Sequence, residues 1–120
     1  MAIAASDFSE RKRWQCGNKT VVRAKYTGPA SYTAGGEVLT NDILKAAFGL
    51  THADLVQCET TLGATFTQGA QLAFDHTPVV GTSQGKFHII DQTGTNVGTE
   101  IVAAQTTFAA FTAWVTVTGY

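Results

Sequence analysis

Residues 111–118 alternate strictly between two kinds of side chain, and this pattern constrains the fold more than any other segment does. The apolar set is Phe111, Ala113, Val115 and Val117, and the other set is Thr112, Trp114, Thr116 and Thr118. Successive side chains of a strand point to opposite faces, so a period of two predicts a half-buried β-strand. Trp114 then lies on the face turned away from the core, where a loop or another chain has to cover it.

Turn residues divide the rest of the chain into short segments, as in an all-β domain. Residues 18–27 alternate in the same way, with Val21 as the one exception, and carry a basic outer face. Further strands are predicted at 55–61, 64–67, 70–75, 86–90 and 99–103. The one helical pattern lies at residues 41–48. Thr40 or Asn41 is suited to cap its start, and Gly49 to end it. The predicted fold is therefore mainly β, a small β-sandwich or jelly-roll-like β-barrel with one short helix near residues 41–48.

The composition is typical of a β-domain that packs against neighbours. Charged residues make up 14% of the chain, against about 25% in an average soluble domain, and 19 of the 120 residues are threonine. Threonine is favoured on pleated, half-buried surface, so the outward faces carry hydroxyl groups rather than charges. A chain of 120 residues allows one core and is too short for an α/β barrel.

Positive charge is concentrated near the N-terminus. Residues 1–25 contain six basic and two acidic residues, whereas residues 26–120 contain two basic and seven acidic ones. Such a basic segment is typical of a nucleic-acid arm, of a solvated strand face, or of an arm that docks on an acidic protein. No membrane-length apolar run and no secretory signal are present, so we expect a cytosolic product with Cys16 and Cys58 as reduced, buried thiols.

The first fifteen residues show no clean period. We therefore expect residues 1–15 to form an N-terminal arm ahead of a single β domain at 16–120. Within the arm, Arg11, Lys12 and Arg13 precede Trp14. A single aromatic residue with no nucleic-acid-binding motif is a weak indication of nucleic-acid binding, so we expect the arm to dock on protein.

Each candidate motif for catalysis or metal binding lacks the context that its chemistry needs. Residues 81–85 match the G-x-S-x-G nucleophile elbow, but a strand pattern follows them, and His88 precedes Asp91 instead of following it. A hairpin turn is the better interpretation. His52, His76 and His88 lack the spacing of metal ligands. We therefore expect no enzymatic activity, no metal and no cofactor.

Four short phrases occur in order along residues 16–120. They are Gly17-Asn18-Lys19-Thr20-Val21-Val22, Ser31-Tyr32-Thr33-Ala34-Gly35-Gly36, Phe48-Gly49-Leu50 and an aromatic last strand that ends near Gly119. In this layout the chain resembles the small head-decoration (capsid cement) proteins of tailed bacteriophages. The resemblance lies in short phrases and their order rather than in a strict signature, so it transfers no individual binding residue.

The resemblance implies a virion structural protein that is made in the host cytoplasm and binds the outer surface of an icosahedral head. It implies the major capsid protein as partner and a homo-oligomer, with a trimer favoured, that bridges capsid subunits without a membrane or direct contact with nucleic acid. From charge and strand parity, we expect six residues at capsid or subunit interfaces: Arg11, Lys12, Arg13, Trp14, Tyr32 and Trp114. The alternatives are a tail-tube or minor tail protein and a carbohydrate-binding β-sandwich.

Overall fold

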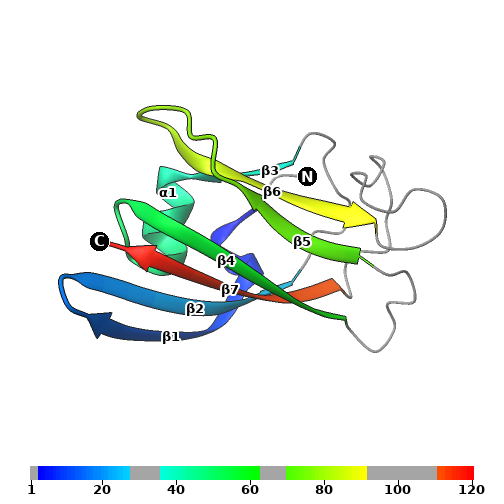
Figure 1. Cartoon of the computed structure of the whole chain (residues 1–120), viewed down its shortest axis with the longest axis horizontal. Coiled ribbons are helices and arrows are strands. Elements are labelled where there is room, and N and C mark those ends of the chain that lie inside the picture. The colour runs from blue at the N-terminus through cyan, green and yellow to red at the C-terminus, as the bar shows by residue number, and fades with distance from the viewer. Residues whose placement is uncertain (1–2, 28–35, 63–69, 92–110) are drawn as a thin grey trace.

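A computed structural model of the chain describes residues 3–27, 36–62, 70–91 and 111–120. The strands are β1 (Phe8–Cys16), β2 (Lys19–Thr27), β3 (Glu37–Thr40), β4 (Ala53–Leu62), β5 (Ala70–Asp75), β6 (Ser83–Asp91) and β7 (Phe111–Gly119). They form a four-stranded sheet in the order β1-β2-β7-β4 and a three-stranded sheet in the order β3-β6-β5 (Figure 1). All neighbouring strands are antiparallel.

The two sheets confirm the predicted mainly β fold. They lie one above the other in Figure 1 and are not closed into a barrel, so the architecture is that of a small β-sandwich. Within the described residues, no helix is long and apolar enough to cross a membrane.

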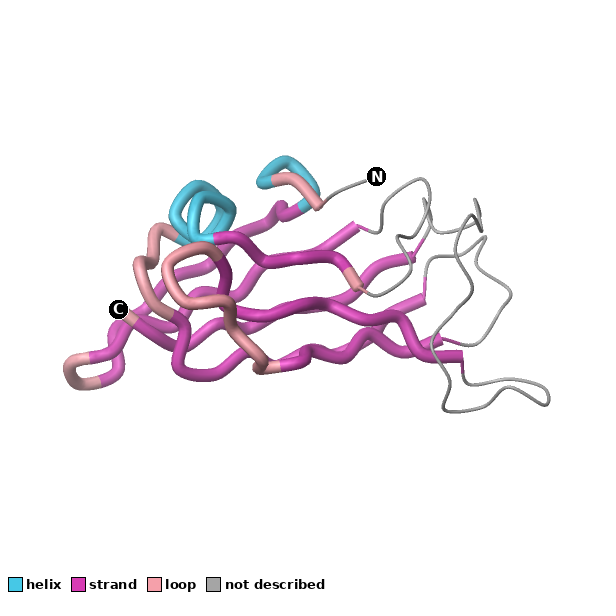
Figure 2. Tube along the Cα trace, turned by 90° about the horizontal axis from the view of Figure 1, so that it is seen from above, coloured by secondary structure: helices cyan, strands magenta, loops and turns pink. Residues whose placement is uncertain are grey.

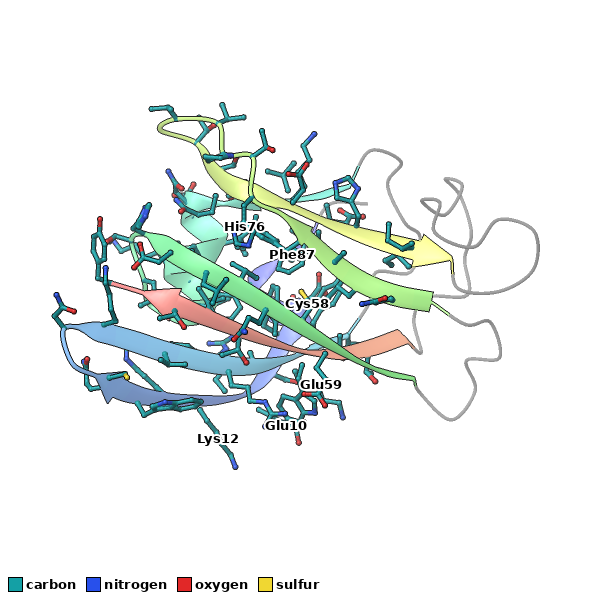
Figure 3. All side chains as sticks on the ribbon, viewed as in Figure 1. Glu10, Lys12, Cys58, Glu59, His76 and Phe87 are labelled. Atoms are coloured by element: carbon teal, nitrogen blue, oxygen red, sulfur yellow. The ribbon has the colours of Figure 1, made fainter. Side chains whose placement is uncertain are left out.

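The core is built around rings from both sheets. Phe8 of β1 lies with its ring centroid 5.2 Å from that of Tyr26 of β2, and Tyr26 stacks on Phe87 of β6 at 6.0 Å. The Phe87 side chain lies between the sheets (Figure 3). Because all three rings are almost fully buried, their removal from water is a main source of stability.

The predicted helix is confirmed. It begins as α1 (Asn41–Ile43) and continues as the π-helical turn η2 (Leu44–Phe48). Of the two candidate caps, Thr40 acts, since its hydroxyl accepts a hydrogen bond from the backbone N–H of Ile43 at 3.2 Å. Gly49 follows at φ 67°, a left-handed conformation that ends the helix. A second, unpredicted helical turn, η1 (Ala5–Asp7), lies close to η2 (Figure 2).

The expectation of an unpaired N-terminal arm is wrong for residues 8–15. They belong to β1, which pairs with β2 along its length. A tight turn at Gly17 and Asn18 connects the two strands. One extra residue forms a β-bulge at Glu10 and Arg11, and Glu10 has a positive φ of 51°. These residues lack a period of two because the strand is exposed on both faces beyond Phe8, so burial selects no alternation.

The other predicted strands agree with the structure where it describes them. The segments 18–27, 55–61, 70–75, 86–90 and 111–118 correspond to β2, β4, β5, β6 and β7. The predicted strands at 64–67 and 99–103 lie outside the described residues. The short strand β3 was not predicted. The expected hairpin turn near 81–85 is confirmed, although β6 already begins at Ser83.

Candidate interaction face of the four-stranded sheet

The four-stranded sheet turns one face to the core and the other to solvent. Residues directly opposite each other on neighbouring strands share a face, so the register arranges the outward side chains in rows. The rows, read from β1 across β2 and β7 to β4, are Trp14–Val21–Thr118–Leu55, Lys12–Arg23–Thr116–Gln57 and Ser9–Lys25–Trp114–Glu59. We call this surface the outer sheet face.

The first row contains large apolar side chains in contact with solvent. Trp14 is 47% exposed and Leu55 is 44% exposed, at opposite edges of the sheet. Between them, Val21 is largely covered by its neighbours. Exposed aromatic and aliphatic side chains that share one face are typical of surfaces that bind other proteins.

Trp114 lies on this face as strand parity predicts, and a side chain of the neighbouring strand covers part of it. The Arg23 guanidinium carbon lies 4.4 Å from the centroid of the Trp114 ring, a cation–π contact. The same guanidinium is 3.9 Å from the Glu59 carboxylate. These contacts fix the indole before any partner arrives, although cover by a loop or another chain remains a prediction.

A shallow, open depression of about 270 Å³ lies beside Trp114 between β4 and β7. Its lining residues are Gln57, Cys58, Glu59, Trp114 and Thr116. The sulfur of Cys58 belongs to the inner side of β4, where burial raises its pKa to about 12. Because Arg23 already occupies a position over the indole, the depression is a weak platform for stacking a sugar ring.

The charges of the outer sheet face are nearly balanced. The Nζ of Lys25 lies 3.6 Å from the Glu10 carboxylate, and the Nζ of Lys19 lies 2.6 Å from Asp54. Lys12 makes no ion pair or hydrogen bond with any residue that the structure describes. Figure 3 shows Lys12, Glu10 and Glu59 on the side of the sheet away from Phe87.

The consecutive cations Arg11, Lys12 and Arg13 do not form one patch. Arg11 Nη2 donates to the carbonyl oxygen of Phe8 at 3.2 Å, and Arg13 Nη1 donates to that of Phe48 at 3.1 Å. Phe48 is the last residue of η2, so Arg13 places a positive charge where helix carbonyls lack partners. Arg13 thus anchors β1 to the helix end, Arg11 bonds within β1, and of the three only Lys12 projects from the outer sheet face.

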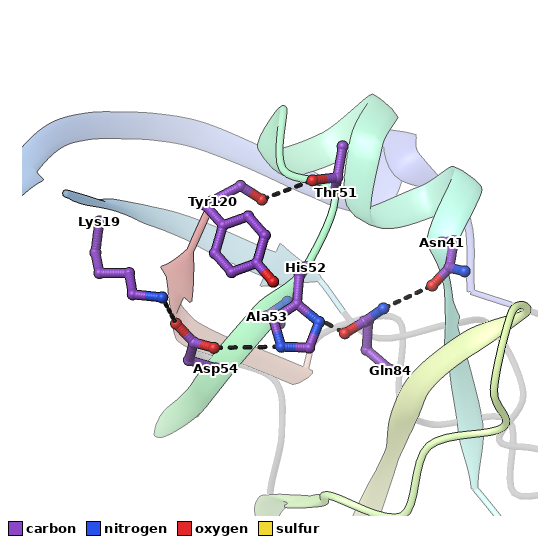
Figure 4. A network of polar contacts seen from close by, with 8 residues as sticks. All are labelled: Lys19, Asn41, Thr51, His52, Ala53, Asp54, Gln84 and Tyr120. Atoms are coloured by element: carbon purple, nitrogen blue, oxygen red, sulfur yellow. Dashed lines mark hydrogen bonds and ion pairs between the residues drawn. The ribbon is translucent and has the colours of Figure 1, made fainter.

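A polar network joins the strands at the end of the molecule where β7 ends (Figure 4). The carboxylate of Asp54 accepts from Lys19 and lies 3.2 Å from His52 Nε2, and the hydrogen bond from Lys19 is the main reason that its pKa is lowered. The amide of Gln84 accepts from the backbone N–H of Ala53 at 3.1 Å and donates to Asn41 at 2.7 Å. Gln84 thereby connects the two sheets and the helix, a structural role.

The residues of the histidine and serine motifs contact neighbouring residues. His76 packs edge-on against Phe74, and His88 Nε2 lies 3.9 Å from Asp75. Among the described residues, no three histidine, cysteine or acidic side chains gather as a metal site. Ser83 is buried, and its hydroxyl accepts a hydrogen bond from the backbone N–H of Val79, which stabilises the β5–β6 turn.

Of the six expected interface residues, the outer sheet face brings together Lys12, Trp14 and Trp114. Arg11 and Arg13 point to backbone carbonyls instead, and Tyr32 lies outside the described residues. Leu55 was missed, although its parity relative to the buried Val56 indicates an outward position. Cys16, expected to be buried, is exposed, and neither cysteine is in a disulfide.

Comparison of the chain with protein-family models, with curated proteins and with solved structures found no match.

Proposed function

We propose that this chain is a virion structural protein, a decoration protein that binds the outer surface of a phage head as a homo-oligomer and bridges capsid subunits. The sequence resemblance suggests this function. The structural observation that carries it is the exposed edge strand β1, which offers a partner protein a place to add a strand.

β1 is suited to binding because little covers it. From Ser9 to Cys16 every residue is exposed, and among the described strands only β2 pairs with β1. The far edge of β1 therefore presents backbone N–H and C=O groups to any extended segment that approaches. Addition of a strand to such an edge supplies affinity through main-chain hydrogen bonds.

The strand is also held ready for binding. Phe8 anchors its start in the core, and Arg13 fixes its second half to the end of η2. A partner that pairs with β1 consequently meets an ordered strand and does not have to order an arm.

The charge of β1 favours an acidic partner over a second β1. The strand carries Arg11, Lys12 and Arg13 against the single acid Glu10. Two copies of β1 side by side would place like charges opposite each other, which is destabilising, and the bulge at Glu10 also disturbs regular pairing. An extended, acidic segment on the capsid surface is the complementary partner.

The location of the protein in the virion tests this proposal most directly. Antibody labelling of intact virions should mark the head surface, whereas labelling of tails would favour the tail-protein alternative. In a reconstruction of the head, a capsid segment should run beside β1. Contact made only through the three-stranded sheet would contradict the role of β1.

A charge reversal tests the contribution of Lys12. Purified Lys12→Glu protein is added to expanded heads that lack this chain, at a concentration at which wild type sediments as a monomer. It should bind about fivefold more weakly than wild type, since an exposed ion pair contributes up to about 1 kcal/mol. Lys45→Glu makes the same charge change on η2 and should bind like wild type. Equal binding by all three proteins would show that Lys12 does not contact the capsid.

A further inference from the structure

The outer sheet face has an uneven distribution of charge from edge to edge. The cations Lys12, Arg23 and Lys25 lie on β1 and β2, while Asp54 and Glu59 lie on β4 at the opposite edge. Glu10 is the exception, and Lys25 lies beside it. The face as a whole is nearly neutral, so it fits neither nucleic acid nor a strongly charged protein surface.

This distribution, together with the exposed apolar row, makes the face complementary to itself. We propose that two copies of this chain associate face to face through their outer sheet faces, about a two-fold axis parallel to the strands. The axis runs between β2 and β7, so β1 of each copy lies over β4 of the other and β2 lies over β7.

The rows match under this symmetry. Trp14 of one copy lies over Leu55 of the other, because both belong to the same cross-strand row at equal distances from the axis. Two exposed apolar side chains thus cover each other, and the contact occurs twice. In the third row, Lys25 of one copy lies over β7 of the other at the position of Trp114, because Lys25 and Trp114 are cross-strand neighbours.

The free charges also match. Lys12 has no ionic partner within the described part of its own chain. In the pair, Lys12 faces β4 of the other copy at the row of Gln57, next to the row of Glu59. The Glu59 side chain is 76% exposed, and its carboxylate lies 3.9 Å from Arg23 of its own chain. Each copy therefore contributes one cation and one carboxylate that the other copy can use.

The available area suffices for a pair of modest affinity. With about 4.8 Å between strands and about 3.4 Å per residue, four strands of some nine residues make a face of about 590 Å². Two such faces bury about 1,200 Å² in total, slightly more than the roughly 1,000 Å² that a specific interface needs. The geometry is two-fold, in contrast to the trimer that the phage resemblance implies, and it leaves the edge of β1 accessible.

Sedimentation of the purified chain tests the pair without reference to any capsid, so its outcome is independent of the proposed function. Wild type should show a monomer–dimer equilibrium with a dissociation constant below about 1 mM. Leu55→Asp should raise the dimer dissociation constant at least tenfold, because each substitution introduces two buried charges across the two-fold axis. Val80→Asp is the matched control, since Val80 is 96% exposed and lies in the β5–β6 turn, away from the face. A monomeric wild type, or equal effects of both variants, would overturn the proposal.

A disulfide trap tests the pairing of rows. In a Cys16→Ser background, the double variant Trp14→Cys and Leu55→Cys places its new cysteines three strands apart in one chain, about 14 Å, which is too far for an internal disulfide. Mild oxidation should give one covalent dimer. No crosslink, or a ladder of longer multimers, would refute the two-fold arrangement.

Discussion

Replacement of Phe8 by alanine distinguishes an N-terminal strand that belongs to the core from an arm that only precedes it. The Phe8 ring is 2% exposed and lies 5.2 Å from the Tyr26 ring and 4.9 Å from the Phe48 ring. Truncation of a buried phenylalanine to alanine costs about 3–5 kcal/mol, through lost burial and the cavity left behind. An unpaired arm would lose almost nothing.

The expected change in melting temperature follows from the length of the chain. For a domain of about 120 residues the entropy of unfolding is about 0.25 kcal/mol per kelvin, so this loss lowers the melting temperature by about 12–20 °C. Calorimetry at low protein concentration measures the shift without a contribution from self-association.

The matched control is Ser9→Ala, which changes the next residue of the same strand at an exposed position. It should change the stability by less than about 0.5 kcal/mol. If Phe8→Ala is too unstable to purify, Phe8→Leu keeps most of the volume and should cost about 1–2 kcal/mol. Melting of Phe8→Ala within about 2 °C of wild type would refute the placement of Phe8 in the core.

Three further predictions concern titration, reactivity and catalysis. Because Lys19 lowers the pKa of Asp54, stability from this pair is complete above the ordinary aspartate pKa and is lost as the pH falls through the lowered value. The urea concentrations at which wild type and Asp54→Asn are half unfolded should therefore differ at about pH 6 and converge at about pH 2. At about pH 8, iodoacetamide should modify the exposed Cys16 and spare Cys58, whose pKa burial raises to about 12; equal labelling by mass spectrometry would contradict this. Esterase, glycosidase and nuclease assays should be blank, and a turnover that disappears in Ser83→Ala would show that the serine is catalytic.

The local sequence pattern was sufficient to predict a strand wherever that strand is buried on one side only. The alternation in β2 and β7 predicted both strands and their inward faces, because one-sided burial imposes a period of two. The helix was equally predictable, because the Thr40 side chain caps its start and the left-handed conformation of Gly49 ends it. Trp114 was placed on the outer face for the same reason.

The local sequence pattern did not predict β1 and β3, whose formation depends on pairing with a neighbouring strand. β1 is exposed on both faces beyond Phe8, so its residues record no periodic burial. The turn at Gly17 and Asn18, which joins it to β2, was the one local signal of a hairpin. β3 has only four residues, too few for a period to be recognised.

The position of Trp14 on the outer sheet face was decided by tertiary structure. Phe8 points to the core, and uninterrupted alternation from it would turn Trp14 inward as well. The bulge at Glu10 and Arg11 inserts one residue and reverses the parity, so Trp14 emerges on the same face as Trp114. The sequence by itself determined which residues alternate, but the register between strands distant in the chain determined which of them meet, because register depends on pairing that no local pattern encodes.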